Sequence, residues 1–406
     1  MTLLTAAWRE GGRRTCAPSE TWRRLAPLLP VFGISRLANI TGLDRVGVPV
    51  YTAVRPNGRS LSVFQGKGLT RDAARVSAAM EAYETWCAET MTGPLHLASI
   101  EEMRFAHPIA DVSRLPLADP AGPDPDLPFL WIEGREMRNG APRWLPFEMV
   151  HANYALPEPA HSGAFSATTN GLASGNTPEE AQLHALMEVI ERDATTLWKL
   201  SPGAWGSDTA VDPASVTDPA CASVLGRFAE AGIETAIWDI RSDLGIPAFY
   251  CLITDPSGET GAAELGAGAH MAPEVALLRA LTEAAQARCT YIAGAREDIL
   301  DEDYGDDAVA ERRAMAEGLV RGLKPTRSFA DIESRETATL ASDIAATLER
   351  LETCGMAEAI AVDLSRKGLP FAVQRVVVPG LEAAFEGPRS DYVPGARAGA
   401  LLGEAP

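Results

Sequence analysis

One pattern occurs three times in the chain and constrains its fold more than any other feature. Each copy reads A-x-x-x-A-x-x-E-x-x-[EQ], with its alanines and its acidic or amide residues at helical spacing. The first glutamates of the three copies are Glu81, Glu188 and Glu283. Because residues three and four apart are neighbours on a helix surface, the pattern predicts three helices that each present an acidic face.

The middle copy lies in a helix whose start is clearly marked. Thr177 suits the N-cap, Pro178 suits the first helical position, and Glu180 completes a capping box. Leucine, valine and isoleucine side chains then form one broad apolar face. The opposite face carries Glu180, His184, Glu188 and Glu191, with Arg192 beside them.

A glycine-rich stretch precedes each predicted helix, at residues 66–68, 171–175 and 266–268. We expect these stretches to be connectors that let the backbone approach a ligand closely. We expect the alanines to keep the surface beside the glutamates open. In the alternative interpretation the acids are solvated and the small residues serve helix packing. Three copies with one spacing favour a shared acidic site.

Several carboxylates brought together repel one another, and their pKa values rise. A hard divalent cation removes this conflict, and magnesium commonly takes one or two carboxylates together with substrate phosphates. The three copies supply more acid groups than one magnesium ion needs. The pattern therefore indicates a nucleoside triphosphate bound with two or more metal ions.

An ordered set of motifs resembles the YcaO family from about residue 35 to residue 397. The motifs are TGLDRVGVPV at 41–50, AVRP at 53–56, QGKG at 65–68, MEAYE at 80–84, GLASGN at 171–176, EVIERD at 188–193, LTEAAQAR at 281–288 and VVVPGLE at 376–382. The resemblance implies an enzyme that uses ATP and magnesium, without a P-loop, to activate a backbone amide of a peptide.

The resemblance also implies roles for individual residues. The acids that it links to metal are Glu81, Glu84, Glu188, Glu191 and Glu283. The residues that it places at the nucleotide are Asn176, Glu180, Arg192 and Gln286. Lys67, in its Gly-Lys-Gly loop, is a candidate contact to a phosphate, and Arg288 is a further candidate for the nucleotide site. Two alternatives stay open, since Glu180 could serve only the capping box and Arg192 could simply pair with Glu188. His184 is the candidate general base, with a plain surface histidine as the alternative.

The nucleophile would decide the product of such an enzyme. External sulfide gives a thioamide, a Cys, Ser or Thr side chain gives an azoline, and an amine gives an amidine ring. The block at 41–50 resembles stand-alone members that work with a TfuA-type partner, so we favour thioamide formation on a precursor peptide. The other options for partners are a leader-binding protein and a second copy of the chain. In a different class of function, the chain would be a nucleotide-binding accessory protein without catalytic activity.

The composition and the pattern of predicted elements limit which partners and which architecture the chain can have. The chain has 406 residues and a net charge of −19, which argues against nucleic-acid and anionic-membrane partners. Without a signal peptide or a membrane-length apolar run, a cytoplasmic protein is expected. Two helix–strand–turn–strand units, at about 224–254 and 344–378, predict an α/β fold of mixed or antiparallel sheets with packed helices and internal repeats. The nucleotide site is expected between the acidic helices.

The expected domain organisation is simple. Residues 1–30 form an N-terminal arm, and residues 31–406 form one catalytic domain in which 98–165 and 296–335 are peripheral insertions. Strand pairs are expected around the turn at 56–58 and around the turn at 139–140.

Overall fold

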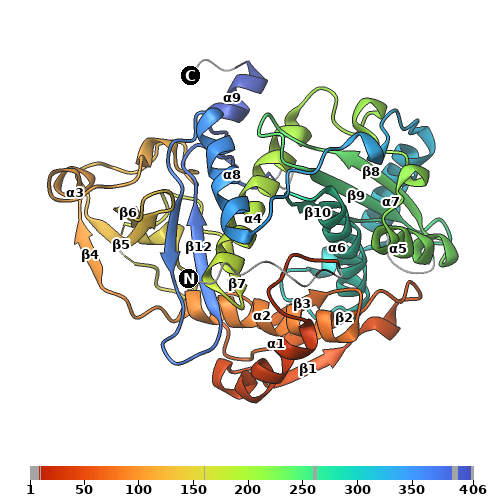
Figure 1. Cartoon of the computed structure of the whole chain (residues 1–406), viewed down its shortest axis with the longest axis horizontal. Coiled ribbons are helices and arrows are strands. Elements are labelled where there is room, and N and C mark those ends of the chain that lie inside the picture. Colours follow the sequence, from red (N-terminus) through yellow and green to blue (C-terminus); the bar gives the residue numbers. More distant parts are fainter. Residues whose placement is uncertain (1–8, 10, 160, 259–262, 386–391, 404–406) are drawn as a thin grey trace.

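The computed structural model of the protein describes residues 9, 11–159, 161–258, 263–385 and 392–403. Its strands form three sheets, and every pairing between named strands is antiparallel. Helices pack against these sheets, so the predicted α/β fold of antiparallel sheets with packed helices is confirmed (Figure 1).

The first sheet contains β1 (Arg36–Asn39), β2 (Val50–Val54) and β3 (Val63–Lys67) in that order. Before it come α1 (Pro18–Leu25) and η1 (Ala26–Phe32), and after it comes α2 (Arg71–Glu89), which packs on β2 and β3. Thr70 caps α2 by accepting a hydrogen bond from the backbone N–H of Ala73. The predicted strand pair around residues 56–58 is therefore confirmed as β2 and β3.

The second sheet has the order β4-β5-β11-β12-β7, with β6 paired to β5. Its strands are β4 (Leu95–Ala98), β5 (Phe129–Glu136), β6 (Pro142–Pro146), β7 (Leu172–Gly175), β11 (Ile360–Asp363) and β12 (Ala372–Val377). Helix α4 (Pro178–Leu200) packs on β7 and β12, and α8 (Leu340–Thr353) and α9 (Ala396–Leu402) pack on α4, while α3 (Ile100–Ala106) follows β4 in the chain. The predicted hairpin around residues 139–140 is confirmed as β5 and β6.

The third sheet has the order β10-β9-β8. It contains β8 (Glu234–Asp239), β9 (Ala248–Thr254) and β10 (Ala263–Ala269), with α5 (Pro219–Glu230), α6 (Pro273–Ala293) and α7 (Asp306–Gly322) around it. The units α5-β8-β9 and α8-β11-β12 repeat one order of elements, as the sequence predicted.

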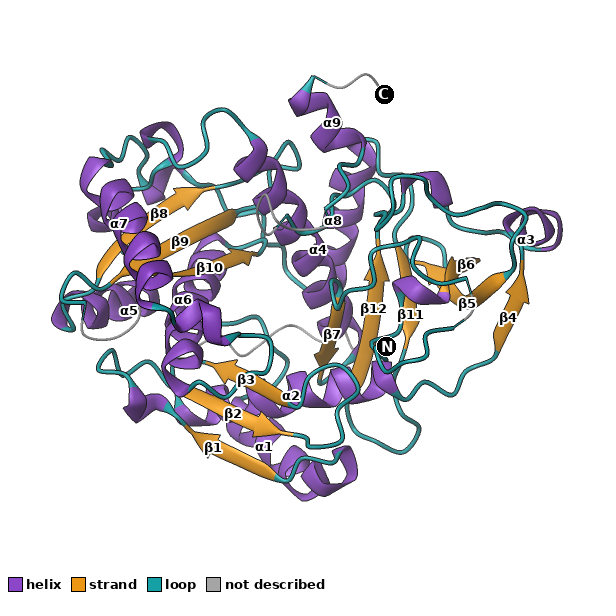
Figure 2. Cartoon of the chain, turned by 180° about the vertical axis from the view of Figure 1, so that it is seen from behind, coloured by secondary structure: helices purple, strands orange, loops and turns teal. Residues whose placement is uncertain are grey.

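Three strand–helix pairs surround the middle of the molecule, namely β3 with α2, β7 with α4 and β10 with α6 (Figure 2). The glycine-rich stretches lie largely within the strands of these pairs and not in connectors before the helices. A Cβ atom on Gly66 would lie 1.9 Å from the backbone nitrogen of Ala78, and one on Gly266 would lie 2.2 Å from the carbonyl oxygen of Ala280.

The alanines of the repeated pattern are buried against these strands. The six pattern alanines are Ala74, Ala78, Ala181, Ala185, Ala276 and Ala280, and each is 0% exposed. They therefore do not keep the surface beside the glutamates open, and that expectation was wrong. Small residues in the helix and in the strand let the two backbones approach closely. This close packing places the glutamate, one helical turn after the second alanine, at a fixed position beside the sheet.

No helix in the described part of the chain is both long and apolar enough to cross a membrane.

Candidate nucleotide and metal site

A cavity of about 1090 Å³ lies between the three strand–helix pairs. Eleven of the twelve residues that the sequence analysis assigned to a site line this cavity. They are Lys67, Glu81, Glu84, Asn176, Glu180, His184, Glu188, Glu191, Arg192, Glu283 and Gln286. Helices far apart in the sequence thus present their acidic faces to one space, whose size suits a nucleotide with a segment of peptide.

Hydrogen bonds hold several of the carboxylates to neighbouring elements. The hydroxyl of Ser174 on β7 donates to Glu84 over 2.7 Å, and the backbone N–H of Gly171 donates to Glu188 over 3.3 Å. The backbone N–H of Ala269 on β10 donates to Glu191 over 3.1 Å. These contacts aim each acid into the cavity and link α2 to β7 and α4 to β10.

Three of the acids hold protons more strongly than an ordinary glutamate. Burial raises the pKa of Glu81 to about 7, although Lys67 and Arg296 act in the opposite direction. Burial also raises the pKa of Glu84 well above its usual range, and it raises the pKa of Glu188 against the effect of Arg192. The nearby glutamates add to each shift, so the protein alone does not neutralise this cluster.

The carboxylate of Glu283, unlike the three acids above, has a cationic partner. The ammonium group of Lys67 on β3 lies 2.6 Å from the carboxylate of Glu283 on α6. Burial acts to raise the pKa of Glu283, but Lys67 and the guanidinium of Arg192 outweigh it and lower the pKa to about 2. Arg279, one turn earlier on α6, lies 3.6 Å from Glu191. The cavity therefore pairs an acid-rich wall with cations that could contact phosphate groups.

Residues of the N-terminal arm line part of the cavity. Arg14 lies 3.1 Å from the carboxylate of Glu180, and Thr15 donates to the same carboxylate from its backbone N–H and from its hydroxyl. Burial would raise the pKa of Glu180, but Arg14 and Thr15 hold it below its usual value. Thr177 caps α4, but the Glu180 side chain turns to the arm, so only half of the predicted capping box forms.

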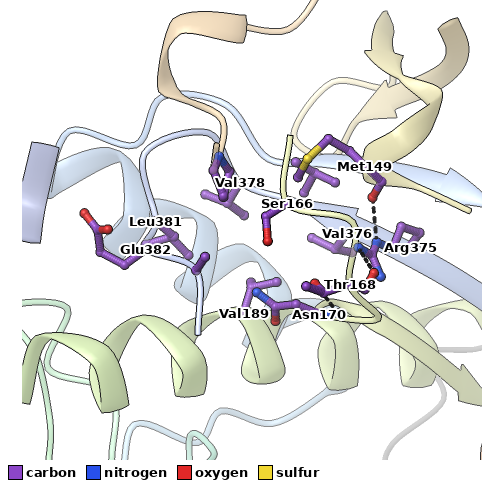
Figure 3. A pocket seen from close by; sticks show the side chains of 13 residues that line it. Met149, Ser166, Thr168, Asn170, Val189, Arg375, Val376, Val378, Leu381 and Glu382 are labelled. Carbon is purple, nitrogen blue, oxygen red and sulfur yellow. Dashed lines mark hydrogen bonds between the residues drawn. The ribbon is translucent and has the colours of Figure 1, made fainter. Parts of the chain in front are cut away.

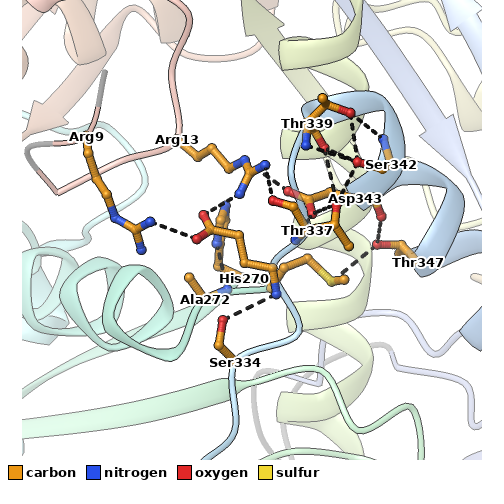
Figure 4. Close-up of polar contacts among 12 residues, drawn as sticks. Arg9, Arg13, His270, Ala272, Ser334, Thr337, Thr339, Ser342, Asp343 and Thr347 are labelled. Atoms are coloured by element: carbon orange, nitrogen blue, oxygen red, sulfur yellow. Dashed lines mark hydrogen bonds and ion pairs between the residues drawn. The ribbon is translucent and has the colours of Figure 1, made fainter. Parts of the chain in front are cut away.

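Ion pairs fasten this arm to distant parts of the chain (Figure 4). The guanidinium of Arg13 lies 3.0 Å from Asp343 on α8 and donates to the carbonyl oxygen of Thr337 over 2.7 Å. Arg13 and Arg9 both pair with Glu336. Arg9 and residues 11–16 are thus held at defined positions beside the cavity. The arm contains five arginines, and their local sequence does not indicate which acidic groups they pair with.

His184 does not have the surroundings of a general base. Its Nε2 atom lies 2.8 Å from a guanidinium nitrogen of Arg279, and its Nδ1 atom lies 3.3 Å from one of Arg14. Guanidinium groups only donate, so Arg279 engages the lone pair of the neutral ring. Burial and these two cations lower the pKa of His184 well below its usual value. The neutral ring therefore links α4 to α6 and lies next to Arg14 of the arm.

Arg288 is the twelfth candidate, and the structure places it away from the cavity. It is 2% exposed, and its guanidinium lies 3.1 Å from Asp44 and 3.0 Å from Asp255. Arg288 occurs only two residues after Gln286, but on a helix this places the two side chains on different faces. The prediction of a nucleotide contact is corrected to a buried ion pair that joins α6 to the 41–50 motif and to the end of β9.

Several lining residues were missed by the sequence analysis. The cavity is also lined by Arg14, Tyr154, His270, Arg279, Arg296, Asp298, Asp303 and Arg312. Arg279 could have been found, because it lies one helical turn before Glu283 on the same face. The last four belong to the segment 296–335, which was expected to be peripheral. Tertiary contacts alone bring its first part to the cavity.

The residues present fit magnesium held jointly with a polyphosphate. Within the residues that the structure describes, no three His, Cys, Asp or Glu side chains are close enough to hold a metal ion by themselves. Magnesium usually takes only one or two carboxylates and completes its shell with water and phosphate oxygens. Acids with raised pKa values on one wall and cations nearby provide the donors and the charge balance for such a complex.

Comparisons with known proteins relate the chain to proteins of similar sequence and fold. A family model described as YcaO cyclodehydratase, ATP- and Mg2+-binding, matches residues 65–382. An uncharacterized protein from the tfuA 3′ region of Rhizobium leguminosarum bv. trifolii is 36% identical over 386 residues, which cover 92% of this chain and 90% of that protein. An uncharacterized protein of Methanothermobacter thermautotrophicus is 35% identical over 373 residues, or 90% of this chain and 94% of that protein.

Two solved structures share the fold. A heterocyclase in complex with substrate and cofactor aligns with a TM-score of 0.79 at 24% identity over 99% of this chain, which spans 56% of that chain. YcaO from Methanopyrus kandleri bound with AMPPCP and Mg2+ aligns with a TM-score of 0.75 at 24% identity, covering 94% of this chain and 95% of that one.

Proposed function

The chain belongs to the YcaO family, whose cofactors are ATP and Mg2+, and from that premise we propose that it activates a backbone amide of a peptide. The observation that supports this best is the meeting of five glutamates from three helices at one cavity. In this proposal Glu81, Glu84, Glu188, Glu191 and Glu283 hold magnesium. The residues assigned to the nucleotide are Lys67, Asn176, Glu180, Arg192 and Gln286.

In this proposal, different parts of the cavity wall contact the nucleotide and the peptide. When bound, ATP would supply the phosphoryl group that converts the amide oxygen into a phosphate leaving group, and magnesium would offset the charge of the phosphates. Lys67, Arg192 and Arg279 offset the charge of the phosphates, and the fixed carboxylates set the position of the metal. The arm and α4 cover the nucleotide end. The wall formed by Tyr154 and residues 296–312 is left for the peptide.

The favoured product is a thioamide. Sulfide from a separate source would replace the amide oxygen, with ADP and phosphate as the other products. Support comes from the relative encoded beside tfuA, which matches 92% of this chain. By the same reasoning we propose a TfuA-like partner protein. The second candidate is azoline formation, in which a substrate side chain supplies the nucleophile, because the matching family model is described as a cyclodehydratase.

Mass spectrometry of a modified peptide distinguishes the two products. The protein is incubated with ATP, Mg2+, sulfide and the peptides encoded near its gene, with and without a co-expressed TfuA-like neighbour. A thioamide exchanges oxygen for sulfur and requires sulfide, whereas an azoline loses water and does not. A peptide whose amide oxygen carries a heavy isotope passes that label to phosphate in both cases.

Peptide-dependent ATP hydrolysis tests the enzyme assignment itself. We expect Glu188→Gln to lower hydrolysis by about 100-fold or more, since charge stabilisation of this kind is worth two to three orders of magnitude. Glu179→Gln is the matched control, because Glu179 is exposed on the first turn of the same helix. Binding of ATP without turnover, with every candidate peptide and partner, would favour the accessory protein.

A further inference from the structure

His270 borders the large cavity, and the proposed function assigns it no role. A smaller cavity behind residues 166–170 has a volume of about 30 Å³, which is room for about two water molecules (Figure 3). A further group that binds a larger ligand is therefore expected at the large cavity. His270 lines it from the link between β10 and α6, directly after Ala269, whose backbone N–H donates to Glu191. The histidine is thus one position away from a contact that holds an acid assigned to magnesium.

The hydrogen bond at one ring nitrogen of His270 decides what the other nitrogen can do. Nδ1 accepts from the backbone N–H of Ala272 over 3.0 Å (Figure 4). A neutral imidazole has one N–H and one lone pair, so the proton lies on Nε2. Within the described residues Nε2 has no hydrogen-bond partner, yet it is not shut off from solvent. Because the ring lines the cavity, His270 offers an N–H donor to whatever binds there.

The groups around the ring keep it neutral and are themselves donors. Burial and the guanidinium groups of Arg279, Arg13 and Arg14 lower the pKa of His270 to about 3. A guanidinium group only donates hydrogen bonds, so these three neighbours cannot accept one from Nε2. All three line the same cavity. The acceptor for Nε2 therefore comes from a ligand or from water, and an anion fits a place that is surrounded by cations.

Phosphate oxygens suit this place better than the other parts of a nucleotide. Magnesium usually bridges carboxylates and phosphates, so the phosphates are expected close to Glu191 and hence to the neighbouring His270. A phosphate group has several oxygens, which can accept from a histidine and from guanidinium groups together. The N-terminus of α6, which begins at Pro273, adds the positive end of its dipole.

We propose that the Nε2–H group of His270 donates a hydrogen bond to a phosphate oxygen of the bound nucleotide, with Arg14 and Arg279 as its charged neighbours. The inference rests on the proposed function for the nucleotide, but it does not depend on the peptide. His270 thereby helps to fix the phosphate chain beside the carboxylates, and it does so without adding a further positive charge.

A pair of substitutions separates the donor from the fold of the link. The oxygen of His270→Asn can still accept from Ala272, but this side chain places no donor at the position of Nε2. His270→Gln carries an NH₂ group that reaches that position. In calorimetry of the full chain with Mg2+ and AMPPCP, we expect His270→Asn to bind about tenfold more weakly or worse, the factor for one hydrogen bond to a charged group. His270→Gln should recover most of this loss.

His96→Asn is the matched control, since His96 is exposed on β4, and it should bind AMPPCP like the parent protein. Inorganic tripolyphosphate with Mg2+ shows which part of the nucleotide is contacted, because it has no nucleoside. His270→Asn should lose the same factor toward tripolyphosphate. Parent-like affinity of His270→Asn for AMPPCP, or a loss toward AMPPCP but not toward tripolyphosphate, would overturn the proposal.

Nitrogen NMR of the histidine rings adds a readout that a purely structural role would not move. In ¹⁵N-labelled protein at neutral pH, His270 should show its proton on Nε2. Saturation with AMPPCP and Mg2+ should shift Nε2 and its proton and leave Nδ1 unchanged. A proton on Nδ1, or an Nε2 signal that stays in place when the nucleotide is bound, contradicts the inference.

These results are separable from the test of the proposed function. If nucleotide binding depends on His270 but no peptide supports hydrolysis, amide activation fails as a function and the role of His270 stands. If peptide-dependent hydrolysis occurs and His270→Asn keeps the parent KM for ATP, the role of His270 alone is refuted. If the parent protein does not bind AMPPCP with Mg2+, both proposals fall.

Discussion

At the scale of single residues, the raised pKa values make ligand binding depend on pH. Burial raises the pKa of Glu81 to about 7 and raises that of Glu84 and Glu188 as well. The unliganded fold therefore favours the protonated acids, whereas magnesium requires the ionised form. As the pH rises through the pKa that Glu81 has in the folded protein, the unliganded protein loses stability. Over the same range the proton ceases to compete with the metal for the carboxylate.

We therefore expect the affinity for Mg2+ with AMPPCP to increase from pH 6 to pH 8, with net proton release at the lower pH. Calorimetry in buffers of different ionisation enthalpy counts these protons. Glu81→Gln should release fewer protons than the parent protein, which also corrects for the protonation of the nucleotide itself. Equal proton release by the two proteins at both pH values would show that Glu81 does not titrate on binding.

The ion pair of Arg288 leads to a second prediction at this scale. Arg288→Met leaves Asp44 and Asp255 without this buried partner, so we expect a loss of about 3–5 kcal/mol in the free energy of unfolding. Arg104→Met is the control, because its pair with Glu101 is exposed and is worth less than about 1 kcal/mol. Urea unfolding measures both. A stable Arg288→Met protein with weakened nucleotide binding would restore the role that the sequence predicted.

At the scale of elements, the contact between helix and strand decides where the acids lie. A Cβ on Gly266 would lie 2.2 Å from the carbonyl oxygen of Ala280 and 3.0 Å from the Cβ atom of Glu283. Gly266→Ala therefore has to push α6 away from β10, and we expect a loss of about 1–3 kcal/mol or more. Nucleotide affinity should fall as well, because Glu283 moves with the helix.

Gly318→Ala is the matched control for this substitution. Gly318 lies in α7 with no atom within 4 Å of an added Cβ. Alanine there should stabilise the protein by about 0.5–1 kcal/mol, since glycine is a poor helix former. Denaturant unfolding and nucleotide titration of the two variants separate close packing from general helix propensity. Similar effects of both substitutions would contradict the packing argument.

At the scale of the whole molecule, the arm connects the start of the chain to a helix more than 300 residues later. Burial raises the pKa of Asp343, and Arg13 is one of the groups that oppose this shift. Arg13→Ala removes that partner and the contact with Thr337. We expect faster hydrogen exchange in residues 11–16 and a severalfold higher KM for ATP, because Arg14 loses its fixed position beside Glu180.

Arg23→Ala is the control for the arm, since Arg23 is exposed on α1. It should leave the hydrogen exchange of residues 11–16 and the KM for ATP unchanged. If Arg13→Ala speeds hydrogen exchange in the arm but leaves KM for ATP at the parent value, the arm covers the cavity without contributing to nucleotide binding.

Much of this protein follows from local sequence. Helical spacing predicted α2 and α4, a capping threonine marked the start of α4, and turn residues predicted the strand pair and the hairpin. These signals are local because each depends only on residues that are close together in the sequence. The repeated pattern also singled out the glutamates that meet at the cavity, and the ordered motifs identified the family.

The rest depended on contacts between residues far apart in the chain. The sequence does not show that pattern alanines face strand glycines, that the arm reaches Glu180, or that Arg288 is paired to Asp44. A helical pattern fixes which residues share a face, but packing energy decides what that face meets. The sequence by itself determined the elements and the family, and tertiary structure decided which polar groups reach the cavity and which are neutralised inside the protein.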